Sequence, residues 1–159
     1  MTSPPRSLRR AQLADLPRLT ELWIEITAHH GALDPLFTQR PGAEGEIRRL
    51  IGAMLEDPDA AIFVWEVADD LLGFCSVRVD RAPPILVETR RAEIIDLGVC
   101  PSARRRGVGR ALVDAALAWT GDRDAARIEV RVATRNREGQ AFWRALGFEN
   151  LMDVLQRRL

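Results

Sequence analysis

Residues 93–119, EIIDLGVCPSARRRGVGRALVDAALAW, constrain the fold more than any other part of the chain. The first seven are apolar and β-rich, which is typical of a buried strand. After a segment with proline, arginines and glycine, apolar residues recur at helical spacing from Val108 to Trp119. A strand that leads through a glycine turn into a helix indicates an α/β protein.

The rest of the chain extends this pattern to a single mixed α/β domain over 8–159, preceded by a frayed polar tail, 1–7. Residues 61–67 and 72–79 are short, apolar and β-rich, and Asp69-Asp70 between them favours a hairpin. The remaining expected elements are a short strand at 8–10, helices at about 15–31, 43–56, 108–119 and 139–145, and strands at 93–99, 128–132 and 148–156.

Composition excludes several functional classes. The 159 residues are 47% hydrophobic and carry 23 basic and 23 acidic side chains, so no net charge favours nucleic acid or an anionic membrane. Every basic residue is arginine, which rules out a lysine Schiff base. Cys75 and Cys100 have no metal-ligand spacing, and the chain shows no apolar leader or membrane span. We therefore expect a soluble, cytoplasmic protein.

The turn in residues 104–109, RRRGVG, has the features of a phosphate cradle. Glycines allow the backbone to approach a ligand closely, and free N–H groups at a helix start attract an anion. Arginines add charge and bidentate contacts to phosphate. A P-loop would need a lysine, and a dinucleotide fingerprint would need a third glycine where Leu112 stands.

The R-x-x-G-x-G turn follows a strand that ends L-x-V, and a second motif lies downstream. Asn136, then Phe142-Trp143, then Leu146-Gly147-Phe148 match the spacing of the "N-x-x-A-x-x-L-Y-x-x-x-G-F" ending of one family. Together the two motifs resemble the GNAT superfamily of N-acetyltransferases. The resemblance implies a GNAT-like fold, with a central mixed, mostly antiparallel sheet flanked by about four helices.

The resemblance also implies an acetyl-coenzyme A site. Main-chain groups of Leu97 and Val99 would pair with the pantetheine arm, and the Val99 N–H would polarise the thioester carbonyl. Amides of residues 105–110 would hold the pyrophosphate, and the Asn136 side chain would contact the arm. The implied cofactor-binding residues are Leu97, Gly98, Val99, Arg104, Arg105, Arg106, Gly107, Val108, Gly109, Arg110, Asn136, Phe142 and Trp143.

Trp143 stands where many members of the family carry a tyrosine that protonates the departing thiolate. The chain contains no tyrosine, and an indole N–H does not ionise usefully. We expect Trp143 to pack in the core behind the pantetheine arm. Because a thiol is acidic, its departure can rely on water or on a hydrogen bond.

Two carboxylates are candidates for the general base that removes a proton from the incoming ammonium. Glu93 matches a strand glutamate that some family members use, and Asp96 is the second choice. In a regular strand Glu93 lies on the face of Leu97 and Val99, and Asp96 points the other way unless a bulge intervenes. For both, a solvated or arginine-paired carboxylate is an equal alternative.

The acceptor side of the site is predicted from the turn after the first helix, which borders the acceptor pocket in the GNAT arrangement. Trp23, His29, His30 and Phe37 are the candidate substrate contacts. The adjacent histidines do not converge on a metal, and we expect no metal site. Favourable interaction with the helix dipole is the alternative role for the histidines.

The sequence thus predicts an N-acetyltransferase that moves an acetyl group from acetyl-CoA to a primary amine of a small molecule or peptide by direct transfer. One alternative is a non-catalytic CoA-binding sensor or regulatory module, and another is a nucleic-acid-binding domain that uses Arg104, Arg105, Arg106 and Arg110. The resemblance also suggests a homodimer. The identity of the amine, the acyl chain and the oligomeric state are left open.

Overall fold

The structure is a computed structural model that describes residues 6–157. Over this range it contains a five-stranded sheet and four α-helices, which confirms the predicted mixed α/β architecture with about four helices. The elements are β1 (Arg6–Arg10), η1 (Leu13–Asp15), α1 (Leu16–Leu33), η2 (Pro35–Phe37), α2 (Glu44–Glu56), β2 (Ala60–Val67), β3 (Asp70–Arg81), β4 (Arg90–Val99), η3 (Pro101–Ala103), α3 (Val108–Gly121), β5 (Ile128–Val130) and α4 (Arg137–Ala145).

The predicted N-terminal tail, 1–7, extends too far, because the first strand already begins at Arg6. Residues 1–5 lie outside the described part of the chain, but Arg6 and Ser7 already belong to β1 and pair with Val67 and Glu66 of β2. The ladder forms there because β2 extends far enough to offer both residues a partner.

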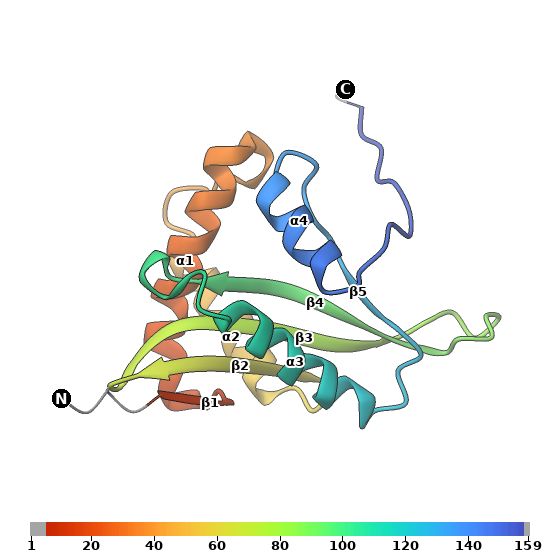
Figure 1. The fold of residues 1–159 in the computed structure, drawn as a ribbon, viewed down its shortest axis with the longest axis horizontal. Helices are drawn as coiled ribbons and strands as arrows, with labels where there is room; N and C mark the ends of the chain where they lie inside the picture. The colour runs from red at the N-terminus through yellow and green to blue at the C-terminus, as the bar shows by residue number, and fades with distance from the viewer. Residues whose placement is uncertain (1–5, 158–159) are drawn as a thin grey trace.

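The strands lie in the order β1-β2-β3-β4-β5, and neighbours are antiparallel except for the parallel pair β4–β5. Figure 1 shows the long β3 and β4 at the centre of the sheet. The β2–β3 hairpin turns at Ala68 and Asp69, which both have positive φ, as a two-residue turn of twisted strands requires.

Two hydrophobic cores cover the two faces of the sheet. One lies between the sheet and the helices α3 and α4, and it includes Leu112, Ala116 and Trp143. The other lies under α1 and α2, with Leu22 and Ile51 among its buried members. The spacing of apolar residues in each helix produces one stripe that faces the sheet, and burial of apolar surface in the two cores is the dominant favourable contribution to folding.

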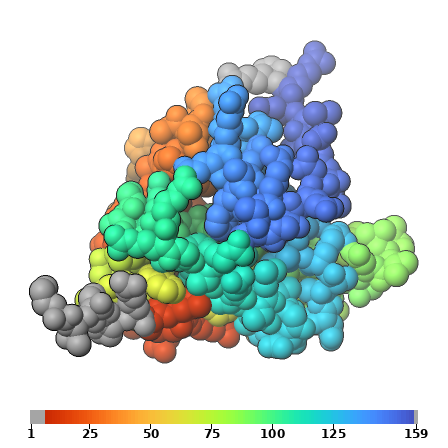
Figure 2. Space-filling model, in the orientation of Figure 1, coloured from red at the N-terminus to blue at the C-terminus, as the bar shows by residue number. Residues whose placement is uncertain are grey.

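The tip between β3 and β4 protrudes at the side of the molecule (Figure 2, light green). Its side chains Ile85 and Val87 are exposed, and at its base Glu88 forms an ion pair with Arg127. The tip is therefore anchored to the segment before β5 by charge and not by apolar packing.

The predicted strand at 148–156 is wrong for the described residues, since residues 148–157 form no strand. In Figure 1 this segment runs away from the sheet after α4. Leu151, Met152, Val154 and Leu155 are exposed in it. Their apolar pattern suggested a strand, but strand formation needs a pairing partner as well as the pattern. No helix in the described range is long and apolar enough to cross a membrane.

Candidate active site

β4 separates from β5 partway along its length. The parallel ladder begins at Ala92–Ile128 and ends at Ile94–Val130, whereas β3 stays paired with β4 as far as Val99. Among the described residues, no strand pairs with the other edge of β4 beyond Ile94. The second half of β4 thus has one open edge, on the side where β5 has ended.

Leu97 and Val99 direct their main-chain groups toward this open edge. The N–H of Cys100 donates to the carbonyl of Leu72 at 2.8 Å, so Cys100 belongs to a pair that is hydrogen-bonded to β3. Because bonded and non-bonded pairs alternate in an antiparallel ladder, Val99 and Leu97 turn their N–H and C=O groups away from β3. Consistent with this direction, the Val99 carbonyl accepts a hydrogen bond from Nε of Arg104 at 2.9 Å.

The arginine-glycine turn presents main-chain donors beside that edge. Arg105 and Gly107 have φ of 59° and 80°, and Gly107 is the N-cap residue of α3. The N–H groups in the first turn of α3 have no partner within the helix. A Cβ placed on Gly107 would meet no atom within 4 Å, so the space over the turn is open. The turn, with exposed Arg104, Arg105 and Arg106 beside it, is suited to bind a phosphate group.

A β-bulge in β4 changes which side chains share a face. Ser76 pairs with Asp96, but the next residue of β3 pairs with Ile94, so Ile95 is the extra residue. Ser76 and Arg78 are two residues apart in β3 and point to the same face of the sheet, and their partners in β4 are Asp96 and Glu93. Glu93 and Asp96 therefore both point to the α1–α2 face. A regular strand would have separated them, and the expected common face of Glu93 with Leu97 and Val99 is therefore wrong. Leu97 and Val99 pack against the core under α3 instead.

The two carboxylates have different surroundings. Glu93 is 17% exposed and lies between two guanidinium groups, with Arg131 at 3.3 Å and Arg78 at 3.9 Å. Asp96 has no ion pair in the described structure, and it contacts the Ser76 hydroxyl, which lies 3.3 Å from Oδ2. Glu93 thus occupies an arginine-paired position, whereas Asp96 remains available for a positive group.

Burial raises the pKa of the Asp96 carboxyl above its ordinary value. The Trp23 indole and the Ser76 hydroxyl oppose this rise, and the charge of His30 opposes it to a smaller extent. Burial also lowers the pKa of His30, and the neighbouring His29 adds to this effect. A carboxylate with a raised pKa is a stronger base, which is the property required of a group that takes a proton from an ammonium.

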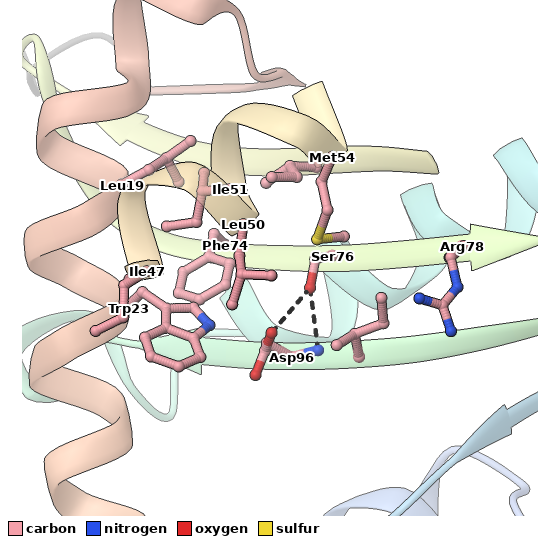
Figure 3. Close-up of a pocket in the computed structure, with 12 residues that line it drawn as sticks. Leu19, Trp23, Ile47, Leu50, Ile51, Met54, Phe74, Ser76, Arg78 and Asp96 are labelled. Atoms are coloured by element: carbon pink, nitrogen blue, oxygen red, sulfur yellow. Dashed lines mark hydrogen bonds between the residues drawn. The ribbon is translucent and has the colours of Figure 1, made fainter. Parts of the chain in front are cut away.

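Asp96 lies in the wall of a cavity of about 200 Å3 between α1, α2 and the sheet. Figure 3 shows its carboxylate beside Ser76, with the indole nitrogen of Trp23 directed toward it. The lining is mainly apolar and consists of Leu19, Trp23, Ile47, Leu50, Ile51, Met54, Ile62, Phe74, Ser76, Arg78, Ile95 and Asp96.

The four predicted substrate contacts do not all meet in this cavity. Trp23 lines it, but His29 lines a second cavity of about 290 Å3, together with Val99 and Arg104. His30 belongs to the lining of neither cavity and meets the ring of Phe37 edge-on, at a centroid distance of 6.4 Å. Phe37 belongs to the lining of neither cavity.

The α4 residues have packing roles in the structure. Trp143 is 8% exposed and lies in edge-to-face contact with Phe142 and Phe148, with centroid distances of 5.1 Å for both pairs. The Asn136 side chain accepts a hydrogen bond from the Gly139 N–H at 2.9 Å and caps α4. Trp143 therefore packs in the core, as expected.

Sequence reasoning missed the apolar cavity wall. Leu50 and Met54 of α2 fit the predicted apolar stripe, and such a stripe indicates core packing. In the structure Leu50 is 63% exposed and lines the cavity, whereas Ile47 and Ile51 beside it are buried. The sequence carried no signal that set Leu50 apart, because the stripe has the spacing of an ordinary core-facing helix. Within residues 6–157, no group of three or more candidate side chains could hold a metal ion.

Comparison with known proteins shows which family has this sequence pattern. The profile described as "Acetyltransferase (GNAT) family" matches residues 19–148. A mycothiol acetyltransferase from Salinispora tropica is 32% identical over 133 residues, which cover 80% of this chain and 40% of that protein. The chain thus spans less than half the length of this relative.

Solved structures share the fold at low sequence identity. An aminoglycoside N-acetyltransferase, AAC(6')-Iy, in complex with CoA has a TM-score of 0.77 at 19% identity, over 99% of this chain and 97% of that chain. A GCN5-related N-acetyltransferase from Ralstonia eutropha has a TM-score of 0.78 at 20% identity, over 97% and 99% of the two chains. At this identity the likeness concerns the fold.

Proposed function

The chain belongs to the GNAT acetyltransferase family, and from this membership we propose that it transfers an acetyl group from acetyl-CoA directly to a primary amine. The open edge of β4 carries the proposal, because it offers the main-chain groups of Leu97 and Val99 beside the phosphate-binding turn. A bound arm with amide groups can pair with that edge as a strand would.

The residues present fit acetyl-CoA. The open space over Gly107 and the free N–H groups of the first α3 turn suit a pyrophosphate, and exposed Arg104, Arg105 and Arg106 would neutralise its charge. Acetyl-CoA supplies the activated acetyl group as a thioester. The Val99 N–H, which faces the open edge, would donate to the thioester carbonyl oxygen and stabilise negative charge there.

We assign the general base to Asp96, and we keep Glu93 as the second candidate. Asp96 carries a raised pKa, lines a cavity and has no arginine partner among the described residues, whereas Glu93 is held by Arg78 and Arg131. Asp96 would take the proton of the ammonium group and leave a neutral amine for attack. Trp143 supplies no proton, so the thiolate leaves without a dedicated side-chain acid.

Two further proposals concern the cellular location of the protein and its oligomeric state. The free cysteines Cys75 and Cys100 are compatible with a reducing cytoplasm. We also propose a homodimer in which the exposed apolar segment at 151–155 contacts a second copy. Sedimentation analysis tests it, since Leu155→Asp should shift a dimer toward monomer, and a monomeric wild type would end the proposal.

The central test measures thermal stability with and without acetyl-CoA. A ligand that binds only the folded state adds about 2.7 kcal/mol at a hundredfold excess over its Kd. Gly107→Glu places a carboxylate over the turn and should abolish this gain. Gly42→Glu is the matched control, because Gly42 also has positive φ (76°) and open space around it, but lies before α2.

Two results would contradict the proposal in different ways. If wild type gains no stability at millimolar acetyl-CoA, the acetyl-CoA site itself is wrong. If the gain appears and Gly107→Glu removes it, but no amine releases CoA thiol, the chain is a CoA-binding sensor instead of an enzyme. Turnover with any amine removes the sensor alternative.

A further inference from the structure

We propose that the acceptor is a small primary amine with one positive charge on an apolar body, bound in the cavity between α1 and α2 with its ammonium on Asp96. This inference rests on the proposed acetyl transfer and specifies its substrate class. Monoalkylamines and arylalkylamines have this chemistry, whereas polyamines and aminoglycosides carry several charges.

The two helices line the cavity with apolar side chains, and the strands add both apolar and polar ones. α1 provides Leu19 and Trp23, and Phe74 is one of the apolar side chains from the strands. The α2 contribution is Ile47, Leu50, Ile51 and Met54. Apolar surface buried in such a wall gains affinity roughly in proportion to its area, and a hydroxylated sugar would lose hydrogen bonds to water without replacement.

The charges in the lining provide for one ammonium only. Within residues 6–157, Asp96 is the single carboxylate of the lining, and the other charged lining residue is the cation Arg78. Arg78 is already paired with Asp80 at 2.8 Å and lies 3.9 Å from Glu93. A second ammonium farther along the cavity would therefore meet apolar side chains or a guanidinium, and its desolvation would not be compensated.

The amine end of the cavity is defined by Trp23 and Asp96. The indole nitrogen of Trp23 is directed toward the Asp96 carboxylate, as Figure 3 shows, so the indole helps to orient the negative group that an ammonium there would meet. Asp96 directly precedes Leu97, whose main chain faces the open edge of β4. An ammonium on Asp96 thus lies beside the strand that would hold the thioester.

The far wall reaches solvent at α2. Leu50 lines the cavity and is 63% exposed, so its side chain forms part of the rim. A longer apolar chain attached to the amine would extend along this wall and cover Leu50. This geometry predicts that affinity increases with chain length.

The test compares n-alkylamines from propylamine to hexylamine with 1,6-diaminohexane, at fixed acetyl-CoA. We expect kcat/KM to rise by about fourfold per methylene, the value that corresponds to burial of one CH2 group. The diamine has the length of hexylamine plus one charge, and it should react at least about tenfold less efficiently, because its second ammonium is desolvated. An aminoglycoside should be poorer than hexylamine as well.

Two variants of α2 test whether the cavity rim causes the discrimination between hexylamine and the diamine. Leu50→Glu adds a carboxylate at the rim and should lower kcat/KM for hexylamine while raising it for the diamine. Ala53→Glu adds the same charge at an exposed residue of the same helix that does not line the cavity, and it should change neither value. A preference for the diamine or an aminoglycoside in wild type, or equal effects of the two variants, overturns the inference.

The acetyl-CoA thermal shift, measured on the same samples, separates this inference from the proposed function. If acetyl-CoA binds and a polycationic amine is the better substrate, acetyl transfer stands and the apolar acceptor class is wrong. If acetyl-CoA does not stabilise the protein and no amine reacts, acetyl transfer fails, and the acceptor class fails with it.

Discussion

The Ser76 hydroxyl contacts Asp96 at two points, accepting its main-chain N–H at 3.0 Å and donating to Oδ2 at 3.3 Å. The ladder between β3 and β4 shifts directly after this pair, so the hydroxyl satisfies a backbone group where the bulge interrupts the sheet. One buried side chain thus holds the bulge and orients the proposed base.

Ser76→Ala should alter the pH dependence of the reaction as well as stability. Loss of the hydroxyl removes a contact that lowers the pKa of Asp96, so the acid limb of kcat/KM should move to higher pH. The unpaired N–H should lower the free energy of unfolding by about 1–3 kcal/mol. Ser102→Ala, at an exposed position, is the control. A destabilised variant with an unchanged pH profile would mean that Ser76 is structural only.

Asp96→Asn and Glu93→Gln should differ in activity. General-base catalysis contributes about 10²–10⁴-fold, so Asp96→Asn should reduce kcat by that amount while the acetyl-CoA thermal shift persists. Glu93→Gln removes a partner of Arg78 and Arg131 and should reduce kcat by less than about tenfold, outside the range of a general base. Steady-state kinetics of both variants decides the assignment, and the reverse order of effects would transfer the base to Glu93.

The free energy of unfolding should respond to pH through Asp96. Its pKa is raised from 3.8 in the folded state, so the folded protein binds this proton more tightly than the unfolded chain. The resulting stabilisation is complete below the unfolded value and is lost as pH rises through the folded value, at about 1.4 kcal/mol per unit of difference.

Asp96→Asn removes this dependence, so the variant should gain stability relative to wild type between pH 4 and pH 7.5. Urea denaturation at the two pH values measures the difference, and other carboxylates such as Asp15 cancel in the comparison. A constant difference would show that burial does not perturb the Asp96 carboxyl.

Trp143→Phe should affect stability more than chemistry. The indole is buried against Phe142 and Phe148, so a smaller ring should cost about 0.5–3 kcal/mol. Because the indole carries no titrating proton, the pH profile of kcat should keep its shape. Trp143→Tyr should bring no increase in kcat. A large increase with tyrosine would instead indicate that protonation of the leaving thiolate limits the rate.

Much of the fold could be predicted from local sequence patterns. The errors occur where pairing between segments far apart in the sequence determines the structure. The stripe in α2 and the strand-turn-helix at 93–119 depend on nearby residues, and both are confirmed. The strand expected at 148–156 has the composition of a strand, but pairing is not encoded in the segment itself.

The candidate site likewise has features that local sequence encodes and features that depend on distant contacts. The glycine-arginine turn is a local motif and was visible in the sequence. The common face of Glu93 and Asp96 depends on one extra residue, Ile95, whose effect follows from the register with β3. Leu50 could not be distinguished from a core leucine, because exposure is set by how α1 and α2 meet.

The absence of a side chain at Gly98 has a mechanical consequence. A Cβ at this position would lie 1.8 Å from Cδ1 of Ile26, so the Ile26 side chain of α1 packs directly on the backbone of β4. Any side chain at residue 98 would displace Ile26 or move α1 away from the strand. The separation between the helix that carries Trp23 and the strand that carries Val99 is therefore set by the lack of a single methyl group.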